Sequence, residues 1–247
     1  MLYPCVSSPS SSAVESLRLE AVTTCVGFDD MLDVTLTRNL PHLDTMIVVT
    51  SHSDAATRKV CAKHGVICVP TDLFVKNGRR FNKGAAINAG LARFQYYGWR
   101  LHLDADIVLP DSFRRVLFNH THLDQNCLYG ADRVDALLRD LDRTRLQYSQ
   151  GCFVRSHLQR EAGTRFVHGF HGYCPIGYFQ LWHCSCQQMY PYSLGTAEHD
   201  DVMFAMLWPE AHRRLLPGVI VAHLVSRFGG RQGENWDGHR REPRLED

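Results

Sequence analysis

The sequence predicts an α/β fold, in which a mostly parallel central sheet is flanked by helices in a single domain. The N-terminal half alternates short apolar, β-branched runs with helical patterns, which is typical of parallel sheets with helical crossovers. The chain has 247 residues, of which 45% are hydrophobic and 21% charged, as in ordinary globular proteins. This length would suit one large domain or two small ones, and no linker marks a second.

The first half predicts four strands separated by three helices. We expect strands at residues 21–26, 45–50, 66–69 and 100–103, and helices at 29–39, 53–64 and 82–96. Pro41 would stop the first helix, and Gly65 would end the second. Ligands of such sheets bind at the carboxyl ends of the strands, so residues that follow strands are the first candidates for a site.

The second half is less regular. We expect a charged helix at residues 133–145, an apolar helix at 202–208 and a last strand at 219–222. The Ser/Pro-rich start predicts a flexible tail over residues 1–18, and the Gly/Arg-rich end predicts a lid or tail over 226–247. Residues 19–225 would form the domain, with a first half at about 19–110 and a second at about 111–225.

Composition and missing motifs exclude several classes of protein. Lys plus Arg number 27 against 26 for Asp plus Glu, so the net charge of +1 predicts no particular partner. No apolar run approaches the roughly 20 residues that a membrane-spanning helix needs. Nine cysteines in no regular framework, with no signal-peptide pattern, predict free thiols in the cytoplasm. The sequence has no phosphate-binding loop of the GxGxxG or GxxxxGK[ST] type, which disfavours a Rossmann dehydrogenase and a P-loop NTPase. The GxSxG nucleophile elbow is also missing.

Two carboxylates, Asp104 and Asp106, end an otherwise apolar predicted strand. Their burial would be costly unless they bind a cation, and hard oxygen ligands suit Mg²⁺ or Mn²⁺ completed by substrate phosphates. The alternative interpretation is a turn or helix cap before Pro110. A second D-x-D sequence, at residues 140–142, lies in a charge-rich run and is interpreted as a solvated helix face.

A family resemblance becomes visible around these aspartates. The segment FNKGAAINAGL at residues 81–91, followed by LHLDADIVLP at 101–110, resembles the donor site of GT-A glycosyltransferases, which have a Rossmann-like fold. It is similar to the family-2 enzymes, especially those of the beta-1,4-galactosyltransferase type. The resemblance spans residues 22–223 and is most specific from 81 to 110.

The resemblance implies a role for each matching residue. Asp106 and Asp104 would bind the Mn²⁺ or Mg²⁺ ion that bridges the donor diphosphate. The other implied donor-binding residues are Thr24, Phe28, Asp54, Lys83 and Asn88, with Asp54 facing the uracil ring. Position alone leaves other interpretations open: Asp54 could be a helix N-cap, Asn88 could bond to the backbone, and Lys83 could be a surface lysine.

An acidic pair precedes the last predicted helix. Asp200 and Asp201 could simply favour the helix dipole. In inverting enzymes of the resembling type, the second carboxylate of such a pair takes the proton of the acceptor hydroxyl, which implies Asp201 as the base and Asp200 as a neighbour that contacts the acceptor. An alternative register places His199 at the base position, and the sequence does not decide between Asp200 and Asp201.

Other residues complete the predicted site. His223 ends the last strand, where the resembling family has a third metal ligand, although a lone histidine is often structural. The segment of residues 151–191 is rich in aromatic residues, and the corresponding region faces the acceptor in this fold. Tyr178 and Trp182 are the predicted acceptor-binding residues, with core packing as the competing explanation.

Together with the resemblance, these patterns predict a metal-dependent inverting glycosyltransferase that uses a nucleotide sugar, in the first instance a UDP-sugar, in the cytoplasm of a bacterium or a phage-infected host. The acceptor would be a glycan or lipopolysaccharide, or a hydroxymethylated pyrimidine in DNA, since the span from Arg133 to Arg165 and the C-terminal tail are rich in arginine. The alternatives are a nucleotidyltransferase on a similar sheet and a sugar-nucleotide-binding protein without catalysis. The sequence predicts no oligomeric state.

Overall fold

The computed structural model describes residues 18–78, 81–119, 123–142, 173–191, 196–226 and 243–245. Its strands are β1 (Leu19–Thr24), β2 (Thr45–Thr50), β3 (Ile67–Pro70), β4 (Trp99–Leu103), β5 (Ile107–Val108), β6 (Leu128–Ala136), β7 (Phe179–His183) and β8 (Arg213–Leu224). Its α-helices are α1 (Asp29–Asn39), α2 (Ala55–His64), α3 (Lys83–Leu91), α4 (Phe113–Asn119) and α7 (Ala197–Ala205). Short 3₁₀ helices occupy Leu40–His42, Leu73–Gly78, Leu138–Asp140, Cys184–Cys186 and Glu210–His212.

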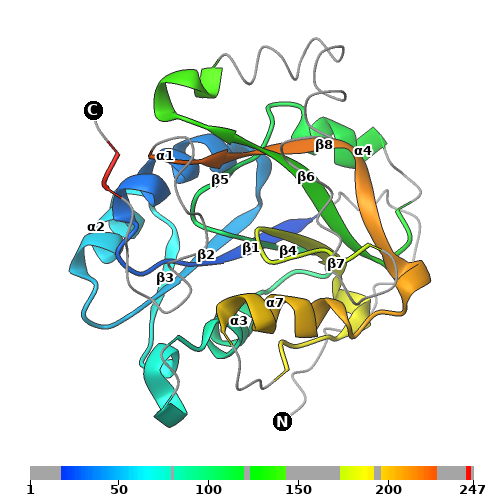
Figure 1. The fold of residues 1–247 in the computed structure, drawn as a ribbon, viewed down its shortest axis with the longest axis horizontal. Helices are drawn as coiled ribbons and strands as arrows, with labels where there is room; N and C mark the ends of the chain where they lie inside the picture. Colours follow the sequence, from blue (N-terminus) through cyan, green and yellow to red (C-terminus); the bar gives the residue numbers. More distant parts are fainter. Residues whose placement is uncertain are drawn as a thin grey trace.

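The described strands form one eight-stranded sheet in the order β3-β2-β1-β4-β7-β6-β8-β5 (Figure 1). Strands β3, β2, β1 and β4 are parallel neighbours. Strand β7 is antiparallel to both β4 and β6, β6 is parallel to β8, and β5 is antiparallel to β8. The predicted α/β class is confirmed, with a sheet that is parallel in its N-terminal half and mixed beyond β4.

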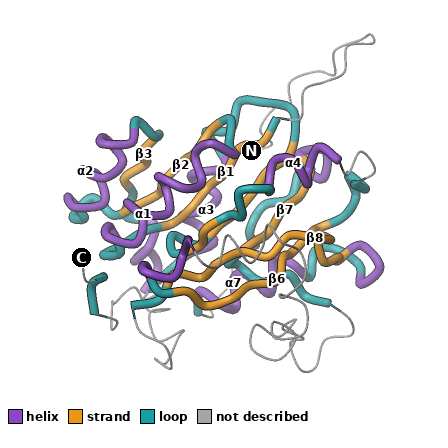
Figure 2. Tube along the Cα trace, turned by 90° about the horizontal axis from the view of Figure 1, so that it is seen from above, coloured by secondary structure: helices purple, strands orange, loops and turns teal. Residues whose placement is uncertain are grey.

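Alternate side chains of the strands point to opposite faces of the sheet, where they pack in two apolar layers. On β2, Met46 and Val48 pack in the layer that includes residues of α1, α2 and α4, whereas Ile47 and Val49 pack in the layer of α3 and α7. Strand β2 is thus buried on both faces, as its continuous apolar sequence indicates. Helices α3 and α7 lie side by side under the sheet in Figure 1, and Figure 2 shows the β3 edge and the long strands β6 and β8 at opposite sides.

Most predicted elements of the first half are confirmed within a few residues. Helix α2 begins after Asp54, whose side chain accepts a hydrogen bond from the Thr57 N–H, and it ends at Gly65. Helix α3 ends at Leu91 and does not reach residue 96 as predicted. The Glu20 carboxylate explains this early end, because it accepts hydrogen bonds from the backbone N–H groups of Gln95 and Tyr96 and holds that segment at the sheet.

The helix predicted at residues 133–145 is wrong at its start. Arg133 lies within β6, which continues to Ala136 and pairs with β8, and a 3₁₀ turn follows at Leu138–Asp140. Pairing with the long strand β8 overrides the local helical pattern. Residues 143–172 lie outside the described residues, as do 1–17 of the predicted N-terminal tail and most of the predicted C-terminal lid.

The described end of the chain is attached to helix α1. The Arg244 guanidinium forms an ion pair with Asp29, and the Leu245 N–H donates to the Asp30 carboxylate. Within the described residues, no helix is long and apolar enough to cross a membrane.

Helix α3 approaches the sheet so closely that one position must be glycine. A Cβ atom at Gly90 would lie 2.4 Å from Val22 Cγ2 and 2.8 Å from Val49 Cγ2. We predict that Gly90→Ala lowers the free energy of unfolding by about 1–3 kcal/mol, although alanine is the better helix former. Thermal and urea unfolding would measure this, with Ala89→Gly as a propensity control; an unchanged or raised melting temperature for Gly90→Ala would contradict the prediction.

Candidate functional site

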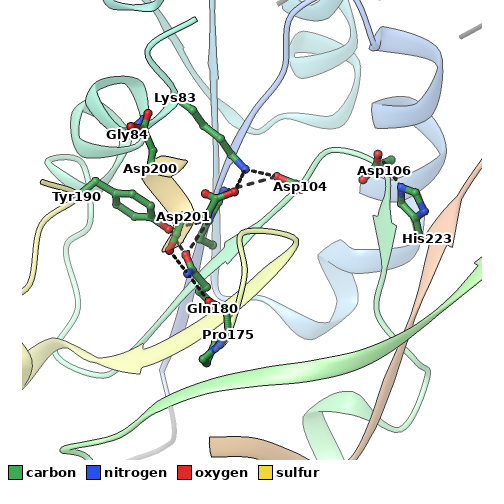
Figure 3. Close-up of polar contacts among 11 residues, drawn as sticks. Lys83, Gly84, Asp104, Asp106, Pro175, Gln180, Tyr190, Asp200, Asp201 and His223 are labelled. Carbon is green, nitrogen blue, oxygen red and sulfur yellow. Dashed lines mark hydrogen bonds and ion pairs between the residues drawn. The ribbon is translucent and has the colours of Figure 1, made fainter. Parts of the chain in front are cut away.

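The candidate site lies where β4 ends and helices α3 and α7 begin. Asp104 follows the last residue of β4, and a tight turn, in which the Ile107 N–H donates to the Asp104 carbonyl, leads through Asp106 into β5. The two carboxylates diverge in the structure. Asp104 faces Lys83, whereas Asp106 faces His223, as Figure 3 shows.

Lys83 joins two carboxylates from distant parts of the chain. Its Nζ atom lies 2.7 Å from Asp104 Oδ1 and 2.9 Å from Asp201 Oδ2. The side chain is buried at the first position of α3, where the Asn82 side chain caps the helix. Burial lowers the pKa of Lys83, but the carboxylates of Asp104 and Asp201 outweigh it and raise this pKa above its usual value. The surface-lysine interpretation is therefore wrong.

Asp201 has the properties of a base. Burial, opposed by Lys83 and reinforced by the charges of Asp104 and Asp200, raises its pKa to about 7. Its Oδ1 atom is buried and has no hydrogen-bond partner within the described residues. A carboxylate with such a pKa is half-ionised near neutral pH and has one oxygen available for a proton.

The neighbouring Asp200 has a structural role. Its Oδ2 atom accepts a hydrogen bond of 2.9 Å from the Gly84 N–H, which links the start of α7 to the start of α3. The side chain is fully buried. The chain also leaves room for Asp201 at Gly177, where a Cβ atom would lie 1.9 Å from Asp201 Oδ2.

His223 lies between two carboxylates. Its Nε2 atom is 3.2 Å from Asp106 Oδ2, and its Nδ1 atom is 2.8 Å from Asp135 Oδ1. Burial lowers the pKa of His223, but Asp106 and Asp135 outweigh it and raise this pKa to about 9. The Asp106 Oδ1 atom is buried without a hydrogen-bond partner in the part of the chain that is described.

The predicted metal ligands are assembled only in part. Asp106 and His223 meet, and the unpartnered Oδ1 atom of Asp106 is a hard oxygen donor that suits Mn²⁺ or Mg²⁺. Asp104 instead pairs with Lys83. The described residues contain no group of three His, Cys, Asp or Glu side chains arranged to hold a metal ion. Among the described residues, a fit to a divalent cation therefore rests on Asp106 and His223.

A buried polar network, which the sequence patterns did not identify, supports this site. The Tyr190 hydroxyl donates to Gln180 Oε1 and lies 2.7 Å from His102 Nδ1. The Gln180 amide donates to the backbone carbonyls of Asp201 and Pro175. This network connects the end of β4 and the start of β7 to helix α7 and bonds to the backbone of Asp201. Figure 3 shows its contacts among Gln180, Pro175 and Asp201.

The other predicted donor-binding residues lie at the ends of β1 and β2 and on α3. Thr24 ends β1, and Phe28 is the N-cap residue of α1. The Asp54 carboxylate caps α2 and accepts a hydrogen bond from the Gly27 N–H. Asn88 exchanges two hydrogen bonds with the backbone of Tyr190. Asp54 and Asn88 thus make the structural contacts of their alternative interpretations, and their roles toward a donor stay predictions.

The two predicted acceptor-binding residues lie in the interior. Trp182 has no exposed surface and packs edge-on against Phe204. The structure corrects the expectation for Trp182, because a fully buried ring in the core offers no surface to an acceptor. The Tyr178 hydroxyl donates to the Ala131 carbonyl, and its ring lies under the Arg133 guanidinium at 4.8 Å. Core packing, the competing explanation, accounts for both rings.

Comparisons with known proteins bear on the fold. No protein-family model and no curated protein matches the sequence. The crystal structure of a mycobacterial protein is similar to this one over 84% of this chain and 65% of the mycobacterial chain, with 16% sequence identity and a TM-score of 0.50. Similarity at this level shows that the two chains share their fold.

Two synthases have structures that are similar to parts of this chain. Glucosyl-3-phosphoglycerate synthase from Mycobacterium tuberculosis, in complex with Mn²⁺, UDP and glucosyl-3-phosphoglycerate, matches 85% of this chain and 71% of its own (14% identity, TM-score 0.49). Mannosyl-3-phosphoglycerate synthase from Rubrobacter xylanophilus matches 47% of this chain and 40% of its own (21% identity, TM-score 0.39). The chain thus spans between 40% and 71% of the length of the three structures described.

The buried His102 predicts a pH dependence of stability. Burial and the nearby Lys83 ammonium hold the pKa of His102 well below its usual value of 6.5. Below pH 6.5 the unfolded chain binds a proton that the folded chain does not, so His102 lowers stability as the pH falls, by up to about 1.4 kcal/mol per pH unit. We predict that His102→Asn makes the decrease in stability between pH 7 and pH 5 shallower.

Urea unfolding at several pH values measures this slope. The matched control is His52→Asn at an exposed position, which should keep the wild-type slope. Equal slopes for His102→Asn and the wild type would show that His102 takes up a proton in the folded protein and would contradict the prediction.

Proposed function

We propose that this chain is a metal-dependent GT-A glycosyltransferase, which transfers a sugar from a nucleotide donor, most simply a UDP-sugar, to an acceptor hydroxyl with inversion. The observation that carries the proposal is the contact of one ammonium, Lys83, with both Asp104 and Asp201. Asp104 belongs to the motif that resembles a donor site, and Asp201 is the predicted base. This contact supports a site in which the donor-binding and proton-accepting residues would lie side by side.

Asp106 and His223 would hold a Mn²⁺ or Mg²⁺ ion. When bound, such an ion supplies charge stabilisation for the leaving diphosphate. Lys83 is also close enough to Asp104 to contribute positive charge to this half of the site. These roles follow the sequence resemblance residue by residue, and the contact between Asp106 and His223 supports them.

Asp201 would accept the proton of the acceptor hydroxyl as that oxygen attacks the sugar. Its pKa of about 7 and its unpartnered Oδ1 atom support this role. Asp200 is committed to the Gly84 N–H, which favours Asp201 over Asp200 as the base. We place the reaction in the cytoplasm, because the seven cysteines that the structure describes are free thiols.

For the acceptor we propose a glycan or another small hydroxyl compound. The alternative of a hydroxymethylated pyrimidine in DNA rested on arginine-rich segments. Arg133, the first of them, is buried against the Tyr178 ring and does not present its charge at the surface. Of the remaining arginines of these segments, the structure describes Arg139, which is exposed, and Arg244, which pairs with Asp29. These two arginines do not form a basic surface, so the described part of the chain gives the DNA acceptor little support.

A donor screen tests the proposal. The purified chain is incubated with each common nucleotide sugar and Mn²⁺, with and without a chelator, and the released nucleoside diphosphate is measured. We expect slow hydrolysis of one donor that the chelator abolishes. Release of pyrophosphate from a nucleoside triphosphate and a sugar phosphate would instead support a nucleotidyltransferase. Metal-dependent binding without any turnover, even with acceptors, would support a binding protein, and absence of all donor binding would refute the proposal.

The acidic pair of α7 gives a sharper prediction for the reaction. With the donor and acceptor identified, Asp201→Asn should lower kcat by about 10²–10⁴-fold and leave binding of Mn²⁺ and UDP unchanged. Since the base must be ionised, wild-type kcat/KM should rise as the pH increases through about 7.

Two further variants make this result specific. Asp142→Asn, at a largely exposed side chain paired with Arg38, is the matched control and should keep wild-type turnover. Asp200→Asn should lower stability more than turnover, because it weakens the bond to Gly84. A larger loss of kcat in Asp200→Asn than in Asp201→Asn would reverse their roles, and unchanged kcat in both would exclude this base mechanism.

A further inference from the structure

We propose that Asp135 is the positioning residue of His223, whose imidazole it holds so that Nε2 faces Asp106 and the divalent cation. The inference rests on the proposed function, since it concerns the metal-binding half of that site. Neither the motifs nor the resemblance marks Asp135, which lies in the segment that the sequence predicts as a helix.

The sheet places Asp135 beside His223. In the parallel pairing of β6 and β8, Asp135 is the register partner of His223. On the other side of β8, Ile107 of β5 is the partner of His223. Two backbone hydrogen bonds secure these positions: the Leu224 N–H donates to the Asp106 carbonyl at 2.7 Å, and the Val225 N–H donates to the Ala136 carbonyl at 2.9 Å. The backbone therefore fixes both carboxylates relative to the ring.

The contacts of the ring assign a separate role to each nitrogen. Nδ1 lies 2.8 Å from Asp135 Oδ1, and Nε2 lies 3.2 Å from Asp106 Oδ2. A neutral imidazole has one N–H donor and one lone pair, and an ionised carboxylate can only accept. When Asp135 accepts the hydrogen of Nδ1, the lone pair is on Nε2, on the side of Asp106. This arrangement is the one in which a histidine binds a metal ion with a carboxylate behind it.

The burial of these side chains agrees with different roles for Asp106 and Asp135. The His223 side chain is only 10% exposed, so its ring has little freedom to turn away. Asp106 keeps a buried Oδ1 atom without a hydrogen-bond partner within the described residues, which is available to a cation. Asp135 contacts the opposite nitrogen of the ring and thus acts on the cation only through His223.

Metal binding without turnover tests the proposal. Mn²⁺ alone is titrated into the purified full chain, and free Mn²⁺ is measured by electron paramagnetic resonance, first without and then with saturating UDP. We expect Asp135→Asn to weaken Mn²⁺ binding by about 10–100-fold. Asp135→Glu should recover part of the loss, and the surface control Asp142→Asn should bind as the wild type does.

A double-mutant cycle separates positioning from a direct role. If Asp135 acts through His223, Asp135→Asn should weaken binding little further in a His223→Ala background. Equal losses in both backgrounds would overturn the proposal, as would wild-type affinity in Asp135→Asn when His223→Ala binds weakly. The melting temperature of Asp135→Asn should stay near that of the wild type; if that variant unfolds, Asp135→Ser and Asp135→Glu take its place in the cycle.

The same titration separates the failure of this inference from that of the proposed function. Wild-type Mn²⁺ affinity in Asp106→Asn and His223→Ala, or no binding of Mn²⁺ by the wild type with UDP present, would refute the metal site itself and Asp135 with it. Weak binding in Asp106→Asn and His223→Ala, with wild-type binding in Asp135→Asn, would refute only the role of Asp135.

Discussion

The buried ammonium of Lys83 is the constraint on which the rest of the site depends. A charge of this kind is tolerated in the interior only when carboxylates surround it, and removal of one partner of such a buried pair costs about 3–5 kcal/mol. Lys83 meets this requirement with Asp104 from the end of β4 and Asp201 from the start of α7. The charge of one lysine therefore connects α3 and the end of β4 with α7, which lies about 100 residues further along the chain.

Backbone groups keep this arrangement in register. The start of α7 is attached to α3 through Asp200 and the Gly84 N–H, and to β7 through the Gln180 amide and the Asp201 carbonyl. Gly177 supplies the space that the Asp201 carboxylate occupies. These contacts hold the Asp201 carboxylate in the interior, and burial is the largest cause of its raised pKa.

The sequence was sufficient for the parts of the structure that local patterns determine. The strand β2 and the helices α1 and α2 have the predicted bounds or nearly so, because each has a clear apolar pattern and start or stop residues. Asp104, Asp106 and His223 were singled out by their places at predicted strand ends and by the family resemblance; the structure brings Asp106 and His223 together, and their roles stay predictions. The helix predicted at 133–145 was wrong at its start because β6 depends on pairing with β8, more than 70 residues away. The same error concealed Asp135, since only a strand places it beside His223.

Burial explains the other differences. Aromatic residues such as Trp182 and Tyr178 are common at sugar-binding surfaces, but a sequence does not show which aromatic rings are needed to fill the core. Both rings are buried in the apolar core of this structure. The Tyr190, Gln180 and His102 network combines ordinary residues whose spacing carries no signal, and only the fold brings them together.

The two aspartates of the D-x-D sequence show how one motif can perform two tasks. Asp104 forms an ion pair with Lys83, which it shares with Asp201, whereas Asp106 contacts His223, which it shares with Asp135. A histidine must be deprotonated to bind a metal ion, whereas the neighbouring carboxylates favour its protonated form. Under the proposed function, a cation held by Asp106 and His223 would therefore have to replace a proton on His223, and the negative charge of a donor diphosphate would offset the charge of the ion. This exchange would favour binding of the cation together with the donor over binding of the cation alone.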